Sequence, residues 1–371
     1  MNPYHTRVNS LQKLMKNVPC DALLIEDNIN LYYLTGLDLS AGKLLVHQQG
    51  AILVVDSRYF ELCEKRSPFP LHLAENTQSI AQLLLLPEYS FIHTLAVSSG
   101  HITYRGFTEL TKEINKINEN RKDSSKIVLK PIENPLEDLR ILKSSEEIQI
   151  LKTAGSLGSE GFDYVCSLLK QGISEEEIAL ELDIFWKRKG FLKTAFDPII
   201  AFAANSSMPH YRAGSARLQK GQHVLIDIGV TYQHYHSDMT RVVYFGTPDP
   251  KIIEIHKIVQ QAQLAALELC RPGTLIGQLD AAARDFIANQ GYGKYFTHSL
   301  GHGVGLEIHE LPILRNKLPY KDVPLQPGMV ITIEPGIYLP GIGGIRIEDT
   351  VVITPKGHEN LTQRATDPRQ I

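Results

Sequence analysis

The sequence predicts an α/β protein of two domains, the second of which contains an internal duplication. Residues 20–130 alternate short apolar strands with helices. Clear helix-start signals follow residue 135, and a segment with an acidic residue inside a strand occurs twice beyond them. We therefore expect an α/β domain at residues 1–135 and an α+β domain at residues 136–371, the latter built from two halves about a pseudo-twofold axis.

The first domain is expected to begin with an apolar strand at residues 22–25. Residues 44–47 and 51–55 are two further strands, and the Gln-Gln-Gly segment between them gives the turn of a hairpin. Residues 116–126 are polar and rich in charge, the composition of a solvated loop or a helix end near a domain boundary. Acids, histidines and glycines form no catalytic pattern in this domain, so we expect the chemistry in the second.

Four helices are predicted in the second domain. They are expected to start at Ser144, Ser174, Asp249 and Leu275. The first two starts are capping boxes, each a serine followed three residues later by a glutamate. The third has proline as its first residue and extends through Leu269, and the fourth ends at Asn289, before Gly291.

A repeated segment places an acid at the same point of both copies. The copies are residues 218–229 and 325–336. The Leu, the Gln and both Gly recur in register, so that Asp227 corresponds to Glu334. A second pair follows, because the Asp-Met-Thr that starts at Asp238 corresponds to the Glu-Asp-Thr that starts at Glu348. The period of about 100 residues is far too long for a solenoid and predicts two αβ halves that face each other.

The four acids predict a site for cations. An acid inside an Ile/Val-rich strand is costly to bury unless a positive charge meets it. If the two halves face each other, all four carboxylates converge on one spot, where they would repel strongly unless divalent ions neutralise them. Two divalent ions match four carboxylates in charge and leave room for one neutral ligand and one hydroxide.

The neutral ligand is expected to be His302, because glycines at positions 301, 303 and 305 flank it and permit close backbone approach. Oxygen-rich ligation with a single nitrogen favours Mn²⁺, Co²⁺ or Fe²⁺ over a structural zinc. A paired site of this kind activates a water and polarises a carbonyl, which indicates hydrolysis. Histidines 234 and 236, which lie close to Asp238 in the sequence, are interpreted as hairpin-turn residues without a role.

The composition excludes several classes of protein. With 371 residues, 43% of them hydrophobic, the chain is a globular protein with a sizeable core. A net charge of −3 predicts no nucleic-acid partner and no membrane partner, and no apolar run approaches the length of a membrane-spanning helix. The N-terminal residues lack the apolar centre of a secretory signal. The four cysteines lie far apart, so we expect free thiols in a cytoplasmic protein.

Two further enzyme classes are disfavoured. The glycine-rich stretches at residues 301–306 and 341–346 fail the G-x-G-x-x-G pattern of a nucleotide loop. No G-x-S-x-G nucleophile elbow is present.

The pattern of four acids and one histidine resembles that of a known family. Asp227, Asp238, His302, Glu334 and Glu348, in this order and at these spacings, are similar to the five metal ligands of the pita-bread metallopeptidases, the group of methionine aminopeptidase, aminopeptidase P and prolidase. The resemblance covers roughly residues 140–360 and extends through the motifs around each ligand. It implies a creatinase-like N-terminal domain, a feature of the Xaa-Pro-cleaving branch. Creatinase itself lacks the full ligand set.

The resemblance also implies the arrangement of the metal ions. Asp227 would bind one ion, His302 and Glu334 the other, and Asp238 and Glu348 would bridge them. The ions are expected to be two Mn²⁺, with Co²⁺, Fe²⁺ or Zn²⁺ as alternatives.

Four further residues match functional positions of the family: His210, His309, Tyr338 and Arg346. The two histidines match those that hydrogen-bond the substrate and stabilise the tetrahedral intermediate. The tyrosine and the arginine match positions behind the metal ligands, from which the arginine orients a carboxylate. Members of the family commonly form homodimers, and we expect one here.

One departure from the family bears on the substrate. Some dipeptide-specific relatives carry an arginine four residues after the second active-site histidine, where it can hold the free carboxylate of the substrate. That position is Ile313 here, and the nearest arginine is Arg315. We therefore expect an Xaa-Pro aminopeptidase that cleaves peptides with proline in second position. The alternatives are an Xaa-Pro dipeptidase (prolidase) and a catalytically silent binding module.

Overall fold

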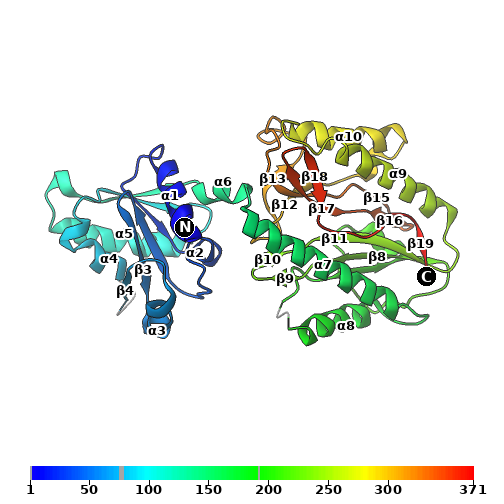
Figure 1. Cartoon of the computed structure of the whole chain (residues 1–371), viewed down its shortest axis with the longest axis horizontal. Coiled ribbons are helices and arrows are strands. Elements are labelled where there is room, and N and C mark those ends of the chain that lie inside the picture. Colours follow the sequence, from blue (N-terminus) through cyan, green and yellow to red (C-terminus); the bar gives the residue numbers. More distant parts are fainter. Residues whose placement is uncertain (1, 75–78, 191–192) are drawn as a thin grey trace. The chain divides into compact units, whose positions relative to one another are not determined.

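The computed structural model describes residues 2–74, 79–190 and 193–371. The chain divides into two compact units, residues 1–139 and 140–371. Each unit mixes helices and strands, as Figure 1 shows in blue to cyan for the first unit and in green to red for the second. The predicted two-domain α/β organisation is therefore confirmed. Among the residues described, no helix combines the length and the hydrophobicity that crossing a membrane requires.

The first unit is built on a six-stranded sheet with the order β4-β3-β2-β1-β5-β6. Strand β2 is antiparallel to both of its neighbours, and the other pairs are parallel. The strands are β1 (Ala22–Ile25), β2 (Lys43–His47), β3 (Gly50–Val55), β4 (Leu71–Leu73), β5 (Thr94–Ser98) and β6 (Val128–Ile132). The first strand and the β2–β3 hairpin lie where the sequence predicted them.

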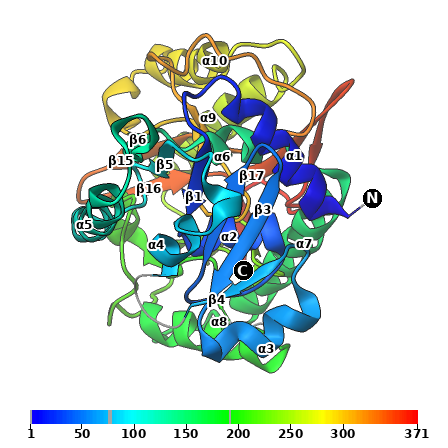
Figure 2. The same ribbon diagram turned by 90° about the vertical axis from the view of Figure 1, so that its left-hand side faces the viewer.

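Helices cover both faces of this sheet. The helices of this unit are α1 (Pro3–Met15), α2 (Asn28–Thr35), α3 (Ser57–Arg66), α4 (Ser79–Leu84) and α5 (Tyr104–Glu119), and α6 (Pro135–Ile141) crosses the boundary between the two units. Ile80 of α4 and Ile114 of α5 pack with Leu24 and Leu95 of the sheet in one buried cluster. Figure 2 shows α4 and α5 on one side of the strands and α1 on the other. Helix α5 ends inside the predicted polar segment, at Glu119.

The described residues of the second unit form two helix pairs and four sheets, the smallest of which are the two-stranded hairpins of β9 (Thr231–Tyr232) with β10 (Tyr235–His236) and of β15 with β16. The helices are α7 (Ser145–Leu168), α8 (Glu175–Arg188), α9 (Pro250–Leu267) and α10 (Ile276–Asn289). The first sheet has the order β19-β11-β8-β7, the second β13-β12-β14-β17-β18, and β15 pairs with β16 alone. Their strands are β7 (Ile199–Phe202), β8 (Gln222–Ile228), β11 (Met239–Phe245), β12 (Gly301–Gly303), β13 (Glu310–Leu314), β14 (Val330–Ile333), β15 (Gly336–Leu339), β16 (Gly343–Arg346), β17 (Asp349–Thr354), β18 (Gly357–Asn360) and β19 (Arg369–Gln370).

All four predicted helices of the second unit are present. The capping boxes of α7 and α8 form as expected: the Ser144 hydroxyl accepts from the Glu147 N–H, and the Ser174 hydroxyl from the Glu177 N–H. Helix α9 starts after its cap Asp249, and α10 ends before a glycine with φ +86°. Several strands were not anticipated, among them β7, β12 and β13. They are short: β12 and β13 pair with each other, and β7 pairs with β8 at the edge of its sheet.

The two halves of this unit have equivalent layers. In the first half, α7 and α8 pack on the face of β8 and β11 that carries Ile226 and Val243. In the second half, α9 and α10 pack on the face of β14 and β17 that carries Ile331 and Val351. The predicted acids alternate with these residues along their strands, so they lie on the opposite, inner faces. This is the internal duplication that the sequence predicted.

The cysteines are expected to be bystanders in any reaction of this protein. All four are free thiols, and Cys63, Cys166 and Cys270 are buried. Burial raises the pKa of Cys166 and Cys270 to about 12, and burial also raises the pKa of Cys63 and Cys20. Because the thiolate is the reactive form, treatment of the folded protein with iodoacetamide should leave turnover largely intact. Rapid inactivation that a substrate slows would contradict this expectation.

Candidate metal centre

The four acids lie at the ends of strands on the inner faces of the two halves. Asp227 is the second-last residue of β8, and Asp238 directly precedes β11. Glu334 directly follows β14, and Glu348 directly precedes β17. Asp227, Asp238 and Glu348 are buried, with 7%, 5% and 2% of their surface exposed. Burial to this degree is unusual for ionisable groups without a counter-charge.

The strand registers of the two halves differ by two residues. Asp227 is paired with Thr240 across β8 and β11. Thr350, the equivalent of Thr240, is instead paired with Thr332, two residues before Glu334. Because side chains alternate with a period of two, this even offset keeps both acids of the second half on the inner face.

Direct hydrogen bonds connect the two halves at the acids. The Glu348 N–H donates to the Thr240 carbonyl oxygen at 3.1 Å, and the Thr350 hydroxyl donates to the Asp238 carbonyl oxygen at 2.8 Å. The Thr240 hydroxyl donates to the Glu348 carboxylate at 2.6 Å. The convergence of acids from two distant parts of the chain is therefore fixed by one backbone hydrogen bond and by two threonine hydroxyl groups.

His302 joins the acids from strand β12. Its Nδ1 lies 3.0 Å from the Gly303 carbonyl oxygen, which can only accept, so Nδ1 carries the proton of the neutral ring. Its Nε2 lies 3.2 Å from a Glu334 oxygen and 3.7 Å from an Asp238 oxygen, and in the neutral ring this nitrogen is the one free to bind a metal ion. A Cβ atom on Gly301 or Gly303 would collide with the backbone of a neighbouring strand. The glycines thus permit the close approach that the sequence suggested.

This donor set fits divalent cations. Ligand atoms of Asp238, His302 and Glu348 all lie within 4.8 Å of one another. Oδ1 of Asp227 is buried and accepts no hydrogen bond from the described part of the chain. Burial, followed by repulsion from Glu348 and Asp227, raises the pKa of Asp238 well above its usual value. Burial, and then repulsion from Glu334, also raise the pKa of Glu348 well above its usual value. The buried carboxyl groups of Asp238 and Glu348 therefore resist ionisation by themselves, and divalent ions would favour their ionised, ligating form.

A chain of hydrogen bonds supports Asp227. The Arg346 guanidinium, at the end of β16, forms an ion pair with the Asp227 carboxylate. It also donates to the Thr240 hydroxyl at 3.1 Å and to the Tyr338 hydroxyl at 2.8 Å. The Tyr338 hydroxyl lies 2.8 Å from Nε2 of His298. Burial raises the pKa of Tyr338 to about 12 and lowers the pKa of His298. The tyrosine is therefore protonated and the histidine is neutral at pH 7.

His298 was not predicted as a residue of the site. The sequence feature that could have identified it is its position, four residues before His302 in the same glycine-rich segment. The histidines 234 and 236, by contrast, lie in the β9 (Thr231–Tyr232) and β10 (Tyr235–His236) hairpin, as expected. His234 has φ +69° in the turn, and Nδ1 of His236 lies 3.1 Å from the Gly305 carbonyl oxygen.

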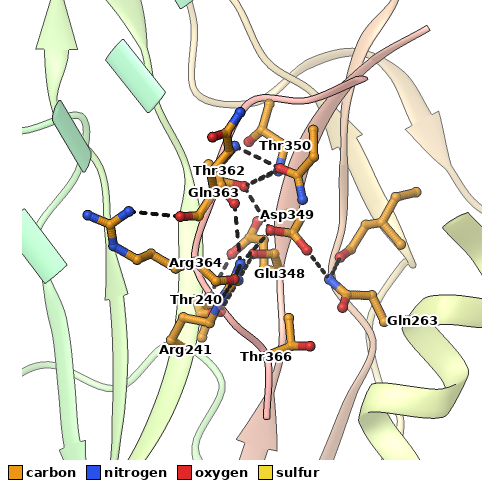
Figure 3. A network of polar contacts seen from close by, with 12 residues as sticks. Thr240, Arg241, Gln263, Glu348, Asp349, Thr350, Thr362, Gln363, Arg364 and Thr366 are labelled. Atoms are coloured by element: carbon orange, nitrogen blue, oxygen red, sulfur yellow. Dashed lines mark hydrogen bonds and ion pairs between the residues drawn. The ribbon is translucent and has the colours of Figure 1, made fainter. Parts of the chain in front are cut away.

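A second buried network holds Glu348 from behind, also unforeseen from the sequence. Arg241 of β11 reaches across to the second half and donates to the Asp349 carboxylate at 2.5 Å and to the Glu348 carbonyl oxygen at 2.5 Å, as Figure 3 shows. Asp349 also accepts from Gln263 of α9 at 3.0 Å and from the Thr362 hydroxyl at 2.9 Å. The pair is buried and fully hydrogen-bonded, so it fixes the backbone on which Glu348 stands.

The two remaining predicted histidines lie at the rim of the centre. The ring of His309 packs edge-on against the ring of His302, with 4.4 Å between centroids. Burial, and then the neighbouring His302, lower the pKa of His309, although the Glu334 carboxylate acts in the opposite direction. His210 is exposed, and its neighbour Pro209 accepts a 3.4 Å hydrogen bond from Arg346. The His309 ring thus contacts the ligand His302 directly, and the chain next to His210 contacts Arg346, the partner of Asp227.

The residue after His309 is held by two buried cations. Glu310 accepts from Lys143 at 2.6 Å and from Arg140 at 2.6 Å. Although burial raises the pKa of Glu310, these two charges lower it below its usual value. The same arginine also contacts Glu307 at 2.6 Å. The loop that carries His309 is therefore anchored at both sides of the histidine.

Ile313 lies directly opposite His302 in the β12–β13 pair. Residues that face each other in an antiparallel pair share one side of the sheet, so Ile313 borders the metal centre. Arg315 is two residues further along, just beyond the end of β13, and is exposed. The asparagine that follows it is fixed by a 3.2 Å hydrogen bond from its N–H to the buried Asp280.

The chain matches two known families along its length. Residues 149–355 match metallopeptidase family M24, and residues 7–142 match the creatinase/prolidase N-terminal domain. It is 38% identical over 364 residues to a Xaa-Pro dipeptidase of Pyrococcus horikoshii, covering 98% of each chain. The solved structure of a Xaa-Pro dipeptidase from Bacillus anthracis is similar with a TM-score of 0.92 at 32% identity, covering 99% of this chain and 100% of that one. An X-Pro aminopeptidase structure from Thermotoga maritima gives a TM-score of 0.86 at 30% identity, covering 97% and 100%.

Proposed function

The chain belongs to metallopeptidase family M24 and carries a creatinase/prolidase N-terminal domain, and from this premise we propose that it is an Xaa-Pro dipeptidase. The proposal depends above all on the buried centre of four carboxylates and one imidazole, in a chain that is similar over its whole length to relatives named Xaa-Pro dipeptidase. The names of these relatives favour the dipeptidase over the aminopeptidase that Ile313 had suggested.

The five residues of the centre would hold two divalent ions. Asp227 would bind one ion, His302 and Glu334 the other, and Asp238 and Glu348 would be shared. Mn²⁺ is the proposed metal, since the ligands are mostly oxygen. Bound there, the ions would supply a nucleophilic water at neutral pH and polarise the scissile carbonyl.

The protein's own groups would orient the substrate. His309 is neutral at pH 7 because its pKa is lowered, so its ring N–H can donate to the oxygen that gains negative charge as the carbonyl is attacked. His210 would donate from the other side of the rim. The ion pair between Arg346 and Asp227 would keep the Asp227 carboxylate oriented toward the metal ions.

Such a centre suits a bond that precedes proline. The bond is a tertiary amide and lacks the N–H that peptidases with an extended-strand binding mode require. The proposed site would bind the N-terminal amine and the scissile carbonyl, and it needs no backbone N–H from the peptide. We also propose that the protein acts as a homodimer in the cytoplasm, where reducing conditions would keep its four thiols free.

An aminopeptidase that accepts longer peptides is the second candidate. The apolar Ile313 side chain lies opposite His302, where it offers no charge to a free carboxylate. Arg315 is the described cation that follows most closely on the same side of β13. The two candidates therefore differ in whether Arg315 binds the carboxylate of a dipeptide.

Replacement of Arg315 tests the choice between them. The wild type, loaded with Mn²⁺, is expected to cleave Xaa-Pro dipeptides with a higher kcat/KM than Xaa-Pro-Xaa tripeptides. Arg315→Ala should lower kcat/KM for the dipeptide by roughly 10- to 100-fold, the effect of losing a hydrogen bond between charged groups, and leave the tripeptide nearly unchanged. Lys317→Ala, an exposed cation of the same loop, is the control. Equal or better cleavage of the tripeptide by the wild type would favour the aminopeptidase.

A further inference from the structure

A buried carboxylate organises the segment that carries His210. Glu175 is the first residue of α8 and is fully buried. Its Oε1 accepts from the Phe202 N–H at 2.7 Å and from the Asn205 side chain at 2.9 Å. Its Oε2 accepts from the Tyr211 hydroxyl at 2.7 Å and from the Gly214 N–H at 3.2 Å. Each carboxylate oxygen thus accepts two hydrogen bonds, and all four donors are neutral.

All four donors belong to one stretch of irregular backbone, residues 202–214, here termed the His210 segment. It leaves β7, passes through the short helix η3 (Ala203–Ser207) and turns at His210. Ala203 has φ +44°, a left-handed conformation that alanine rarely adopts and that persists only where surrounding contacts enforce it. Regular secondary structure does not fix this segment after η3, so its shape depends on side-chain contacts.

The bonds to Glu175 lie on both sides of His210 in the sequence. Tyr211 is its direct neighbour, and burial together with the bond to Glu175 raises the pKa of this tyrosine to about 12, so it remains a donor at any ordinary pH. The Tyr211 hydroxyl also accepts from Asn205 at 3.0 Å, which closes the segment on itself. A Cβ on Gly214 would lie 3.1 Å from that hydroxyl, so the bend fits tightly around the tyrosine.

The other side of the segment touches the metal centre. Pro209 accepts from Arg346, the partner of Asp227. The Ser206 hydroxyl accepts from the Gly344 N–H at 2.7 Å, in the hairpin that carries Tyr338 and Arg346. The His210 segment therefore lies between Glu175 behind it and the centre in front of it, and a displacement at one side moves the other.

We infer that Glu175 is a positioning residue, which holds the His210 segment so that the His210 imidazole reaches the substrate at the metal centre. The inference rests on the proposed function for the role of His210, and on the described contacts for the role of Glu175. A carboxylate suits the task better than an amide. Glutamine has one accepting oxygen, and its NH₂ group would meet donors on the other side.

The test compares Glu175→Gln with a matched control, Glu176→Gln, which removes the same charge from the exposed neighbour in the same turn of α8. Glu175→Gln is expected to lower kcat on an Xaa-Pro dipeptide by roughly 10- to 100-fold, the effect of a small misplacement of a reacting group, and to retain two metal ions by elemental analysis. Hydrogen–deuterium exchange of residues 202–214 should become faster. The control Glu176→Gln should leave kcat, metal content and the exchange rate of residues 202–214 unchanged.

A double-mutant cycle separates positioning from a general loss of structure. If Glu175 acts through His210, Glu175→Gln should cause little further loss of kcat in a His210→Ala protein. Tyr211→Phe, which removes one hydroxyl, should also lower kcat, but by a smaller factor. It replaces Glu175→Gln in the test if that variant does not fold. The same fold-loss of kcat in both backgrounds, or unchanged exchange in residues 202–214, would overturn the inference. If the wild type cleaves no Xaa-Pro dipeptide but Glu175→Gln still speeds exchange in residues 202–214, the proposed function is refuted. The conclusion that Glu175 fixes the His210 segment then still stands.

Discussion

Asp238→Ala is expected to abolish binding of both metal ions and nearly all hydrolysis. Asp238 lies between the two halves, within 3.7 Å of His302 and next to Glu348, and the proposed arrangement makes it a ligand of both ions. Its removal takes away the anchor that they share. The rate should fall on the order of 10³-fold or more, the loss expected when several kcal/mol of metal-derived stabilisation of the transition state disappear.

Elemental analysis after loading with Mn²⁺ gives the direct measurement: two ions in the wild type and none, or one weakly held, in the variant. Thermal unfolding gives a second. Ions that bind only the folded state raise its Tm, so Mn²⁺ should stabilise the wild type and leave the variant almost unaffected. Asp285→Ala, on the exposed side of α10, should behave like the wild type in both measurements. Full activity in a wild type that holds one ion or none would refute the two-ion proposal.

The four acids could be found from the sequence because their signal is local and repeated. Each lies in or next to an Ile/Val-rich strand, and the duplication aligns Asp227 with Glu334. One strand acid alone would have been unremarkable. The repeat also predicted that the two halves face each other, and the cores on the outer faces of β8 and β14 are consistent with it.

The supporting residues could not be found in the same way, because their partners are distant in sequence. Asp349 aligns with the apolar Met239 in the repeat, so the repeat predicted no functional role for it. Only the fold brings Arg241 to it, from 108 residues away. Glu175 is one of three consecutive glutamates in the first turn of α8, a common pattern near a helix N-terminus. Its burial and its four donors distinguish it from its neighbours, and none of these is visible in the sequence.

His309→Ala is expected to slow hydrolysis by roughly 10²- to 10³-fold, the usual effect of losing one donor to a developing oxyanion, with both metal ions retained. The ring of His309 packs against the ring of His302 but forms no ion pair with the acids, so its loss should leave the ligand set whole. The loop should keep its place as well, because Glu310 remains bound to Arg140 and Lys143. Measurement of kcat beside metal content separates this role from that of Asp238.

His309→Gln and His358→Ala sharpen the test. Glutamine keeps a side-chain N–H that can donate, so His309→Gln should recover part of the rate that His309→Ala loses, while a purely structural histidine would show no such difference. His358 is an exposed imidazole in β18, and its replacement should leave kcat unchanged. If instead metal content falls in step with activity in His309→Ala, the histidine supports the metal ligands rather than the transition state. The interpretation of the rim as an oxyanion site would then be wrong, since the edge-on contact with His302 would be what the reaction needs from His309.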